Sequence, residues 1–355
     1  MSTLLGVVTF GAGSGPERFA RGDALARRAE DAGFDSVWVS ELYNRSATIP
    51  MATLATATER VQIGTNIAYG VGRTPLMWAA EARDLDELSE GRIILGLGNG
   101  TKTMMEQWHG VDGDAPAVRM EELVVVLRKL WRLHEGPVQH EGRFYRLNLR
   151  PTSDTPPPFR ERLPIYTAGV QPRMVETAGR VADGVVGHPM FTKRYVDDVV
   201  RPAVAKGAAK TGRDPSEIAL TGVLMCAVDD DVEQARRRLA FAVAQYAASR
   251  VYDPLFALHG WSDQKAAISD AVRSRDERAI LASVTDEILD AVGVACRPGE
   301  LAALVERHIA DYDHVSLVPP PWGLSAEQLE AATVVLIDGM RQSLAQRRGE
   351  PAVSR

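Results

Sequence analysis

The fold is decided by the stretch Ile165-Tyr-Thr-Ala-Gly-Val-Gln-Pro-Arg173, which is followed by Glu176-Thr-Ala-Gly-Arg-Val-Ala-Asp-Gly-Val-Val-Gly-His188. An apolar, β-rich run breaks at Gly169, and a helical segment then opens with Pro172 in its first turn. Proline is tolerated there because the N–H that it lacks would have no partner in the helix. A second short apolar run follows the helix at once. The stretch therefore predicts a strand, a tight turn, a helix and a second strand, which is one β/α unit.

The start of this predicted helix is suited to an anion. Backbone N–H groups at a helix N-terminus and the helix dipole both favour a phosphate or a carboxylate. Arg173 lies in the first turn, where a positive charge is unfavourable for the dipole unless an anion is near. We therefore expect the turn Ala168-Gly169-Val170-Gln171, together with Arg173, to hold the phosphate of a cofactor.

The same alternation runs along the whole chain. Short apolar runs are predicted as strands over 4–10, 36–40, 61–68, 93–97, 165–168, 184–187, 219–228 and 314–318. Amphipathic stretches are predicted as helices over 16–32, 74–88, 118–133, 171–181, 195–210, 231–248, 298–312 and 325–346. Eight strands, each followed by a helix, favour an α/β fold of the closed (β/α)8 TIM-barrel type over an open sheet.

Two segments exceed a minimal barrel. Residues 98–162 follow the fourth strand and contain a predicted hairpin around 142–147, and residues 249–297 follow the seventh strand and are expected to form extra helices. We expect one TIM-barrel domain over 1–347 with these two insertions, followed by a polar tail over 348–355.

Composition and charge narrow the class of protein. The 355-residue chain has 47 acidic and 41 basic residues, so broad attraction to nucleic acid is not expected. No apolar run approaches the roughly 20 residues that span a bilayer, so no membrane partner is expected either. Cys226 and Cys296 are too few for a disulfide framework and are expected to be buried, reduced thiols. These features predict a cytoplasmic protein that acts on a small-molecule substrate.

The ends of the predicted strands carry the candidate site residues, because barrel active sites lie at the carboxyl ends of the strands. These residues are Glu41, Tyr43, Asn66, Ile67, Ala68, Asn99, Gly100, Thr101, Ala168, Gly169, Val170, Gln171 and His188. They include one clear carboxylate, whereas a glycosidase needs two. There is no Gly-x-Ser-x-Gly elbow, and the seven histidines are too scattered to predict a metal site.

These residues predict that the active-site opening of the barrel holds a flat, polar cofactor. Two other interpretations stay open: Glu41 as an ion-pair partner at the rim, and His188 as a structural histidine.

Several motifs in a fixed order give the chain a family resemblance. They include Ala-Glu-Asp-Ala-Gly-Phe-Asp-Ser-Val-Trp-Val-Ser-Glu (29–41), Asp-Glu-Leu-Ser-Glu-Gly-Arg-Ile-Ile-Leu-Gly-Leu-Gly (86–98) and Ala-Gly-Arg-Val-Ala-Asp-Gly (178–184). In this order and spacing, the chain resembles the luciferase-like monooxygenase superfamily, and most closely its coenzyme F420-dependent oxidoreductases.

The resemblance implies a TIM barrel that holds a reduced deazaflavin or flavin at its mouth. It implies a cis peptide bond at Asn66-Ile67, which would form a bulge behind the ring, and it matches the acidic residue after the second strand to Glu41. It also implies that the phosphate binds at Ala168-Gly169-Val170 and the helix that starts at Gln171.

The chain departs from this pattern at two positions. Leu42 stands where members that oxidise an alcohol or a phosphosugar have a histidine, and Thr101 stands where the sugar-phosphate dehydrogenases have a glutamate. These departures favour reduction of an activated double bond, an imine or a ketone. The proton would come from solvent or from Tyr43, His109 or His188.

Three functions stay open at this point. The chain is expected to be an F420-dependent oxidoreductase; the alternatives are an FMN-dependent monooxygenase and a non-catalytic protein that binds F420 or a flavin. Arg45, Arg73 and Lys102 are placed to bind the acidic tail of F420, or else are solvated surface charges. A homodimer is possible, because barrels of this kind often pair through helices on one side.

Overall fold

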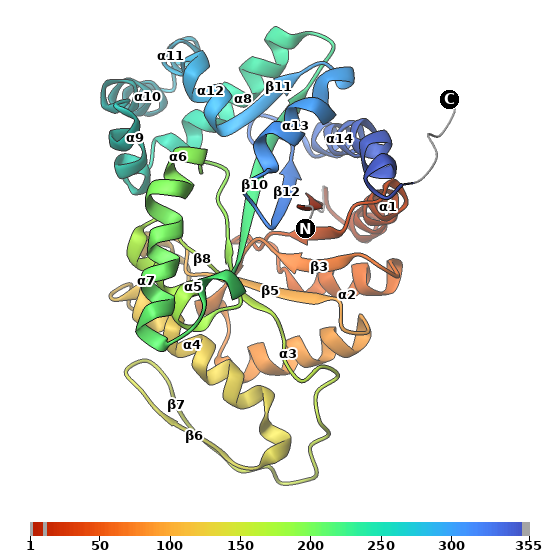
Figure 1. Cartoon of the computed structure of the whole chain (residues 1–355), viewed down its shortest axis with the longest axis vertical. Helices are drawn as coiled ribbons and strands as arrows, with labels where there is room; N and C mark the ends of the chain where they lie inside the picture. Colours follow the sequence, from red (N-terminus) through yellow and green to blue (C-terminus); the bar gives the residue numbers. More distant parts are fainter. Residues whose placement is uncertain (1–2, 10–12, 350–355) are drawn as a thin grey trace. The chain divides into compact units, whose positions relative to one another are not determined.

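The computed structural model describes residues 3–9 and 13–349 of the chain (Figure 1). These residues divide into two compact units. The first unit consists of Met1–Ser36, Gly187–Val200 and Thr221–Arg355, as far as they are described, and the second consists of Val37–Val186 and Arg201–Leu220.

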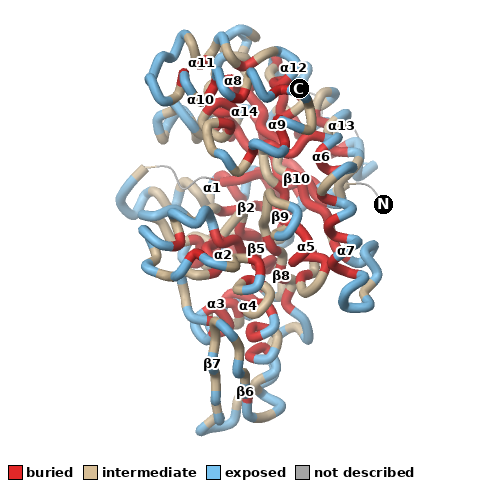
Figure 2. Tube along the Cα trace, turned by 90° about the vertical axis from the view of Figure 1, so that its left-hand side faces the viewer, coloured by how far each residue is buried: buried red, intermediate tan, exposed pale blue. Residues whose placement is uncertain are grey.

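The second unit is built on parallel strands. Their bounds are β2 (Ser36–Val39), β3 (Gln62–Thr65), β4 (Ala68–Tyr69), β5 (Ile93–Gly98), β8 (Ile165–Ala168) and β9 (Gly184–Val186). Strand β5 pairs in parallel with β3, β4 and β8, and β8 pairs with β9. The strands are short and largely apolar, and Figure 2 shows β5 as a buried segment of the chain. This sheet brings the carboxyl ends of β4, β5 and β8 next to one another.

The helices of the second unit follow its strands. Their bounds are α2 (Thr48–Ala57), α3 (Pro75–Leu88), α4 (Pro116–Trp131), α5 (Pro172–Val181) and α7 (Arg201–Thr211). An antiparallel hairpin of β6 (Val138–Glu141) and β7 (Arg146–Leu149) extends beyond α4 (Figure 1). Glu122 of α4 anchors the hairpin, because its carboxylate accepts hydrogen bonds from the N–H groups of Phe144 and Tyr145.

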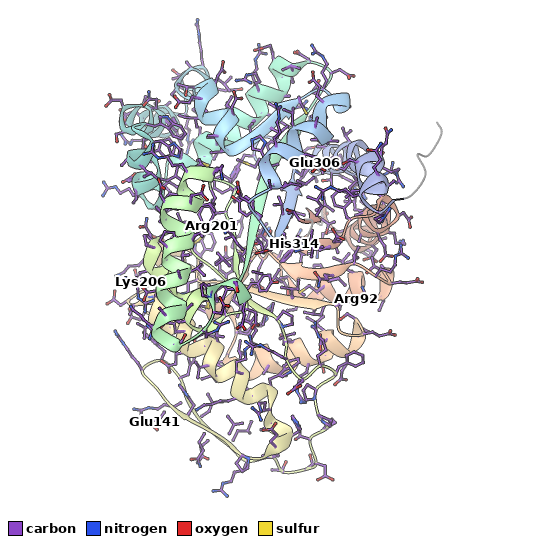
Figure 3. All side chains as sticks on the ribbon, viewed as in Figure 1. Arg92, Glu141, Arg201, Lys206, Glu306 and His314 are labelled. Carbon is purple, nitrogen blue, oxygen red and sulfur yellow. The ribbon has the colours of Figure 1, made fainter. Side chains whose placement is uncertain are left out.

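Side chains fix the loops of this unit as well. The guanidinium of Arg92 donates to the carbonyl oxygens of Ala55 and Thr58, at the end of α2, over 2.8 and 3.0 Å (Figure 3).

The first unit has its own parallel strands. These are β1 (Leu4–Val8), β12 (His314–Val318), β10 (Ala219–Val228, of which Thr221–Val228 lie in this unit) and β11 (Gly293–Cys296), paired in this order. Its helices are α1 (Glu17–Ala32), α6 (Lys193–Tyr195), α8 (Val232–Ala247), α9 (Asp253–His259), α10 (Ser262–Ser274), α11 (Glu277–Ser283), α12 (Asp286–Val292), α13 (Leu301–Ile309) and α14 (Ala326–Arg347). Helix α14 begins with a capping box, in which Ser325 and Gln328 cap each other's backbone N–H groups.

The predicted α/β TIM-barrel class is confirmed, with its insertions after the fourth and seventh strands. Each of the eight predicted strands is found, as β1, β2, β3, β5, β8, β9, β10 and β12, and so is the hairpin. Phe10, predicted in the first strand, and Glu350–Arg355 of the predicted tail lie outside the described residues.

The structure differs from the sequence predictions at three places. Residues 249–297 were expected to be helical, but they end in strand β11, which pairs with the second half of the ten-residue β10. Helix α2 was not predicted. The helix predicted over 195–210 is divided by a π-helical segment, Val196–Val200, just before Pro202, which lacks the N–H that a regular α-helix needs.

Ion pairs between the buried Glu176 and two exposed lysines join α5 to α7 and predict how stability depends on pH. The Glu176 carboxylate accepts from Lys210 over 2.5 Å and pairs with Lys206 over 3.0 Å, and these lysines lower its pKa from 4.5 to about 2 (Figure 3 labels Lys206). A lowered pKa stabilises the folded state above pH 4.5, and this contribution is lost as the pH falls towards 2.

We therefore expect Glu176→Gln to destabilise the protein at pH 7 and to flatten the fall in stability between pH 4.5 and 2. Urea unfolding at several pH values measures both effects. The control is Glu141→Gln, because Glu141 forms an exposed ion pair with Arg146 that contributes little. Parallel pH curves for the Glu176→Gln variant and the natural protein would contradict this assignment.

Candidate functional site

A cavity of about 900 Å³ opens in the second unit beside the carboxyl ends of β2 and β4. Its lining combines polar and aromatic side chains, which are Glu41, Leu42, Tyr43, Asn44, Arg45, Ser46, Tyr69, Gly72, Arg73, Trp108 and His109. The predicted site residues Glu41, Tyr43 and His109 are thus brought together in one wall.

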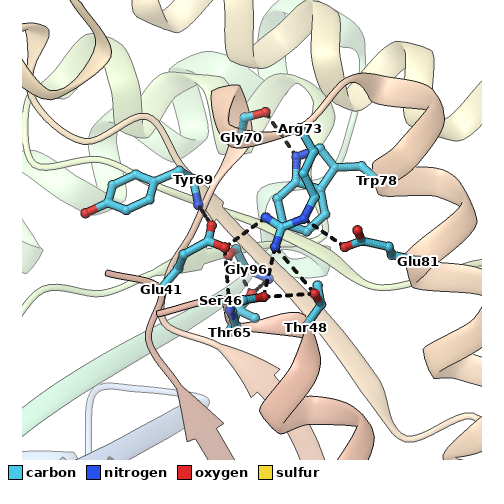
Figure 4. A network of polar contacts seen from close by, with 11 residues as sticks. Glu41, Ser46, Thr48, Thr65, Tyr69, Gly70, Arg73, Trp78, Glu81 and Gly96 are labelled. Atoms are coloured by element: carbon cyan, nitrogen blue, oxygen red, sulfur yellow. Dashed lines mark hydrogen bonds and ion pairs between the residues drawn. The ribbon is translucent and has the colours of Figure 1, made fainter. Parts of the chain in front are cut away.

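Glu41 lines this cavity and is the centre of a polar network (Figure 4). Its side chain is only 9% exposed; one carboxylate oxygen accepts from the Tyr69 N–H over 2.8 Å, and the other accepts from Arg73 over 2.8 Å. Arg73 also pairs with Glu81 at 2.8 Å and lies over the ring of Trp78, 4.4 Å from its centroid. Glu41 is therefore an ion-pair partner that also holds the loop after β4 in place.

The three cations expected at the rim have different surroundings. Arg45 and Arg73 line the cavity, but Arg73 is bound by two carboxylates. Lys102 lies in an ion pair with Asp114 at 2.7 Å and approaches Glu106 at 3.6 Å.

Two of the three predicted proton donors lie at the cavity. Tyr43 is 77% exposed, and its ring contacts Trp108 edge to face at 5.6 Å. The His109 ring lies 5.0 Å from that of Tyr69, and its Nε2 atom is buried and has no hydrogen-bond partner among the described residues. Trp108 was missed by sequence reasoning, because it lies ten residues after the end of β5 and no local pattern marks it.

The end of the third predicted strand has the expected backbone. The Asn66-Ile67 peptide bond is cis, and the Asn66 carbonyl accepts a hydrogen bond from Ser40 Oγ over 2.7 Å. Ile67 lies against Gly98, where an added Cβ would come 2.4 Å from Ile67 Cδ1 and 3.4 Å from Ala168 Cβ. The ends of the third, fourth and fifth predicted strands, which were all expected to bind the cofactor, therefore meet around Gly98.

The loop after β5 holds the next group of predicted residues. Asn99 is buried, and its side-chain amide donates to the Pro116 carbonyl over 2.7 Å. Gly100 has a positive φ of 70° and lies beside Tyr69, whose ring would be 3.1 Å from an added Cβ. The exposed Thr101 accepts a hydrogen bond from the Met104 N–H at its side-chain oxygen.

The turn Ala168–Gln171 leads into α5 as predicted. Pro172 is the first helical residue, and the side chain of the preceding Gln171 forms no capping hydrogen bond. Arg173 has a partner that the sequence did not reveal, because it donates to Glu121 of α4 over 2.6 Å and Arg180 pairs with the same carboxylate. Glu121 thus accounts for a positive charge in the first turn of this helix.

His188, the third predicted donor, belongs to the first unit. Its Nδ1 accepts from the Met190 N–H over 3.1 Å, and its Nε2 lies 2.8 Å from the Tyr252 hydroxyl. Burial lowers the pKa of His188 to about 3, so its ring is neutral at physiological pH.

Over residues 3–9 and 13–349, no cluster of three His, Cys, Asp or Glu side chains is arranged to hold a metal ion. In the same part of the chain, no helix combines the length and apolar character needed to cross a membrane.

Residues 2–312 match the family described as luciferase-like monooxygenase. An uncharacterised protein of Mycobacterium tuberculosis is 34% identical over 292 residues, which cover 79% of this chain and 84% of that protein. A 5,10-methylenetetrahydromethanopterin reductase of Archaeoglobus fulgidus is 28% identical over 280 residues, which cover 77% of this chain and 81% of the reductase.

Solved structures share the fold. The coenzyme F420-dependent tetrahydromethanopterin reductase of Methanopyrus kandleri superposes with a TM-score of 0.76 at 23% identity, covering 96% of this chain and 98% of that one. The oxygenating constituent of 3,6-diketocamphane monooxygenase from Pseudomonas putida, solved with FMN, gives a TM-score of 0.65 at 16% identity, covering 98% and 99%.

Proposed function

The chain belongs to the luciferase-like monooxygenase family, and from this membership we propose that it is an oxidoreductase that uses reduced coenzyme F420 to reduce a small organic substrate. The family contains flavin-dependent and F420-dependent enzymes, and the chain is similar to both kinds. The higher TM-score to the F420-dependent reductase supports the deazaflavin.

The observation that carries the proposal is the meeting of Ile67, Gly98 and Ala168 at three neighbouring strand ends. A residue without a side chain at position 98 leaves an apolar surface formed by Ile67 and Ala168. Such a surface fits the flat ring of a deazaflavin, and the polar groups of Asn66 and Asn99 flank it in sequence.

The remaining parts of the cofactor have fitting residues in the same unit. The turn Ala168–Gln171 and the uncapped start of α5 suit a phosphate, because the first N–H groups of a helix have no partner within it. Arg45 in the cavity wall suits the acidic tail of F420. We assign the cofactor to Glu41, Asn66–Ala68, Asn99–Thr101, Ala168–Gln171 and Arg173.

When bound, reduced F420 supplies a hydride from its deazaflavin ring. The side chains of the protein orient the substrate, exclude water and deliver a proton. Tyr43 and His109 line the cavity and are our candidate proton donors there. Glu41 acts through the backbone, because its bond to the Tyr69 N–H holds one wall of the cavity.

A second function has a specific observation in its favour. The Pseudomonas putida neighbour is a monooxygenase solved with FMN, and its fold covers 98% of this chain. The same strand ends would then hold FMN, and the acceptor of electrons would be oxygen.

An anaerobic assay separates the two functions. The protein is mixed with reduced F420 and cyclohex-2-enone, and the absorbance of oxidised F420 is followed, with reduced FMN in a parallel cuvette. We expect reoxidation of F420 that requires both protein and enone and proceeds without oxygen. No reoxidation of F420 in this assay, together with an oxygenated product that forms only when protein, reduced FMN and air are all present, would establish the monooxygenase instead.

A further inference from the structure

A group of aromatic side chains in the first unit surrounds His188 and takes no part in the function proposed above. His188 follows the carboxyl end of β9, and its ring lies 5.1 Å from that of Tyr252 and 5.0 Å from that of Tyr246. Trp322, which follows β12, packs perpendicular to Tyr246 at 4.3 Å. We call His188, Tyr246, Tyr252 and Trp322 the His188 cluster.

The two hydrogen bonds of His188 determine where its proton lies. Nδ1 accepts from the Met190 backbone N–H, so Nδ1 carries no proton. A neutral imidazole then carries its proton on Nε2. Because Nε2 lies 2.8 Å from the Tyr252 hydroxyl oxygen, His188 is the donor of this bond and Tyr252 is the acceptor.

This assignment leaves the Tyr252 hydroxyl proton for another acceptor. Tyr252 is only 6% exposed, and the sole hydrogen bond of its hydroxyl among the described residues is the one to His188. Burial raises the pKa of Tyr252 and that of Tyr246, so both phenols stay protonated. A buried hydroxyl is normally bonded as a donor, and no acceptor for this proton is found among residues 3–9 and 13–349.

From this geometry we infer that Tyr252 is a ligand-binding residue whose hydroxyl donates a hydrogen bond to a carbonyl oxygen of a small, unsaturated ligand. His188 is a positioning residue, because its Nε2–H donates to the Tyr252 oxygen. The O–H bond of Tyr252 therefore points away from His188. The aromatic rings of Tyr246 and Trp322 supply apolar surface for the rest of the ligand.

The charge of the His188 cluster selects a neutral ligand. Its histidine is uncharged, and neither tyrosine is paired with an arginine or lysine within residues 3–9 and 13–349. A carboxylate in such a place would lose its hydration with no cation to compensate. A ketone, aldehyde or amide oxygen avoids that cost. The binding of this ligand does not depend on the proposed function.

The first experiment tests the tautomer directly. The protein is labelled with ¹⁵N-histidine, and long-range ¹H–¹⁵N spectra of the natural protein and of His188→Gln identify the His188 nitrogens. We expect an Nε2-protonated, neutral ring that does not titrate between pH 5 and 8. A proton on Nδ1 would overturn the inference, because Tyr252 would then donate to His188.

The second experiment measures binding of cyclohex-2-enone to the cofactor-free protein by saturation-transfer NMR, with cyclohex-1-enecarboxylate as the charged comparison. We expect saturable binding of the enone and none of the carboxylate. Tyr252→Phe should weaken enone binding about tenfold, as the loss of one neutral hydrogen bond does. His188→Leu should weaken it similarly, and His188→Gln, which keeps a donor at the Nε2 position, should restore it.

The matched control is Tyr145→Phe, which removes a largely buried hydroxyl bonded to Arg119 near the hairpin. It should bind the enone as the natural protein does. Enone binding that is absent from the natural protein, unchanged in Tyr252→Phe, or weaker than carboxylate binding would overturn the inference. Because no cofactor is present, a failure of the F420 assay leaves these outcomes intact, and the two proposals are tested separately.

Discussion

Glu41→Ala is expected to lower the free energy of unfolding by about 3 kcal/mol at pH 7. The substitution leaves the Arg73 guanidinium, which is 16% exposed, with Glu81 as its remaining carboxylate. It also leaves the Tyr69 N–H without its acceptor. A buried charge and a buried N–H that lose their partner cost more than the intact pair contributes.

Two variants separate these causes. Glu41→Gln keeps an oxygen for the Tyr69 N–H but not the charge, and should cost about half as much. Glu81→Gln leaves the Glu41–Arg73 pair intact and should cost about 1 kcal/mol or less, because Glu81 is more exposed.

Urea unfolding measures each free energy, and a cycle with Arg73→Met measures the coupling between Glu41 and Arg73. We expect the double variant to be more stable than the sum of the single effects predicts. Additive effects would show that the coupling energy between Glu41 and Arg73 is zero.

Gly96→Ala and Gly98→Ala are expected to differ sharply although they lie two residues apart on β5. At Gly96 an added Cβ would lie 1.9 Å from the Thr65 carbonyl oxygen, which is backbone and cannot move aside. Thr65 also exchanges two hydrogen bonds with Gly96, at 2.7 and 2.8 Å. We expect Gly96→Ala to lose at least about 3 kcal/mol of stability or to fail to fold.

At Gly98 the added Cβ would meet the end of the flexible Ile67 side chain instead. Ile67 can turn away, so the expected loss of stability is about 1 kcal/mol. The displaced Ile67 would occupy the surface that we assign to the deazaflavin ring, and F420 binding should weaken about tenfold or more.

Thermal unfolding and F420 titration of both variants check this contrast. If Gly98→Ala left the affinity for F420 unchanged, the surface formed by Ile67, Gly98 and Ala168 would not be part of the cofactor site. Gly96→Ala with natural stability would contradict the close approach of β3 and β5.

The order of strands and helices could be predicted from the sequence because alternating apolar runs and helix-start signals are local. The capping box at Ser325 and Pro172 at the start of α5 are signals of this kind. Strand β11 was missed because Gly293–Cys296 is a short apolar run whose partner, β10, is more than 60 residues away in the sequence. The division of the helix at Val196–Val200 depends on Pro202, a local signal that could have been used.

The sequence could predict which strand ends form the site, but not the hydrogen bonds and ion pairs that the site residues make. Glu41, Tyr43 and His109 were selected because they follow strands, and the cavity brings them together. That Arg73 neutralises Glu41, and that Glu121 neutralises Arg173, depends on contacts between elements that no local pattern encodes. The pairing of His188 with Tyr252 spans 64 residues and has no sequence signature.

The most direct test of the central claim is a fluorescence titration of the purified protein with F420 and, separately, with FMN. We predict that F420 binds at least about tenfold more tightly than FMN, a difference of about 1.4 kcal/mol. Tighter binding of FMN, or binding of neither cofactor, would contradict the assignment of this chain to F420 chemistry.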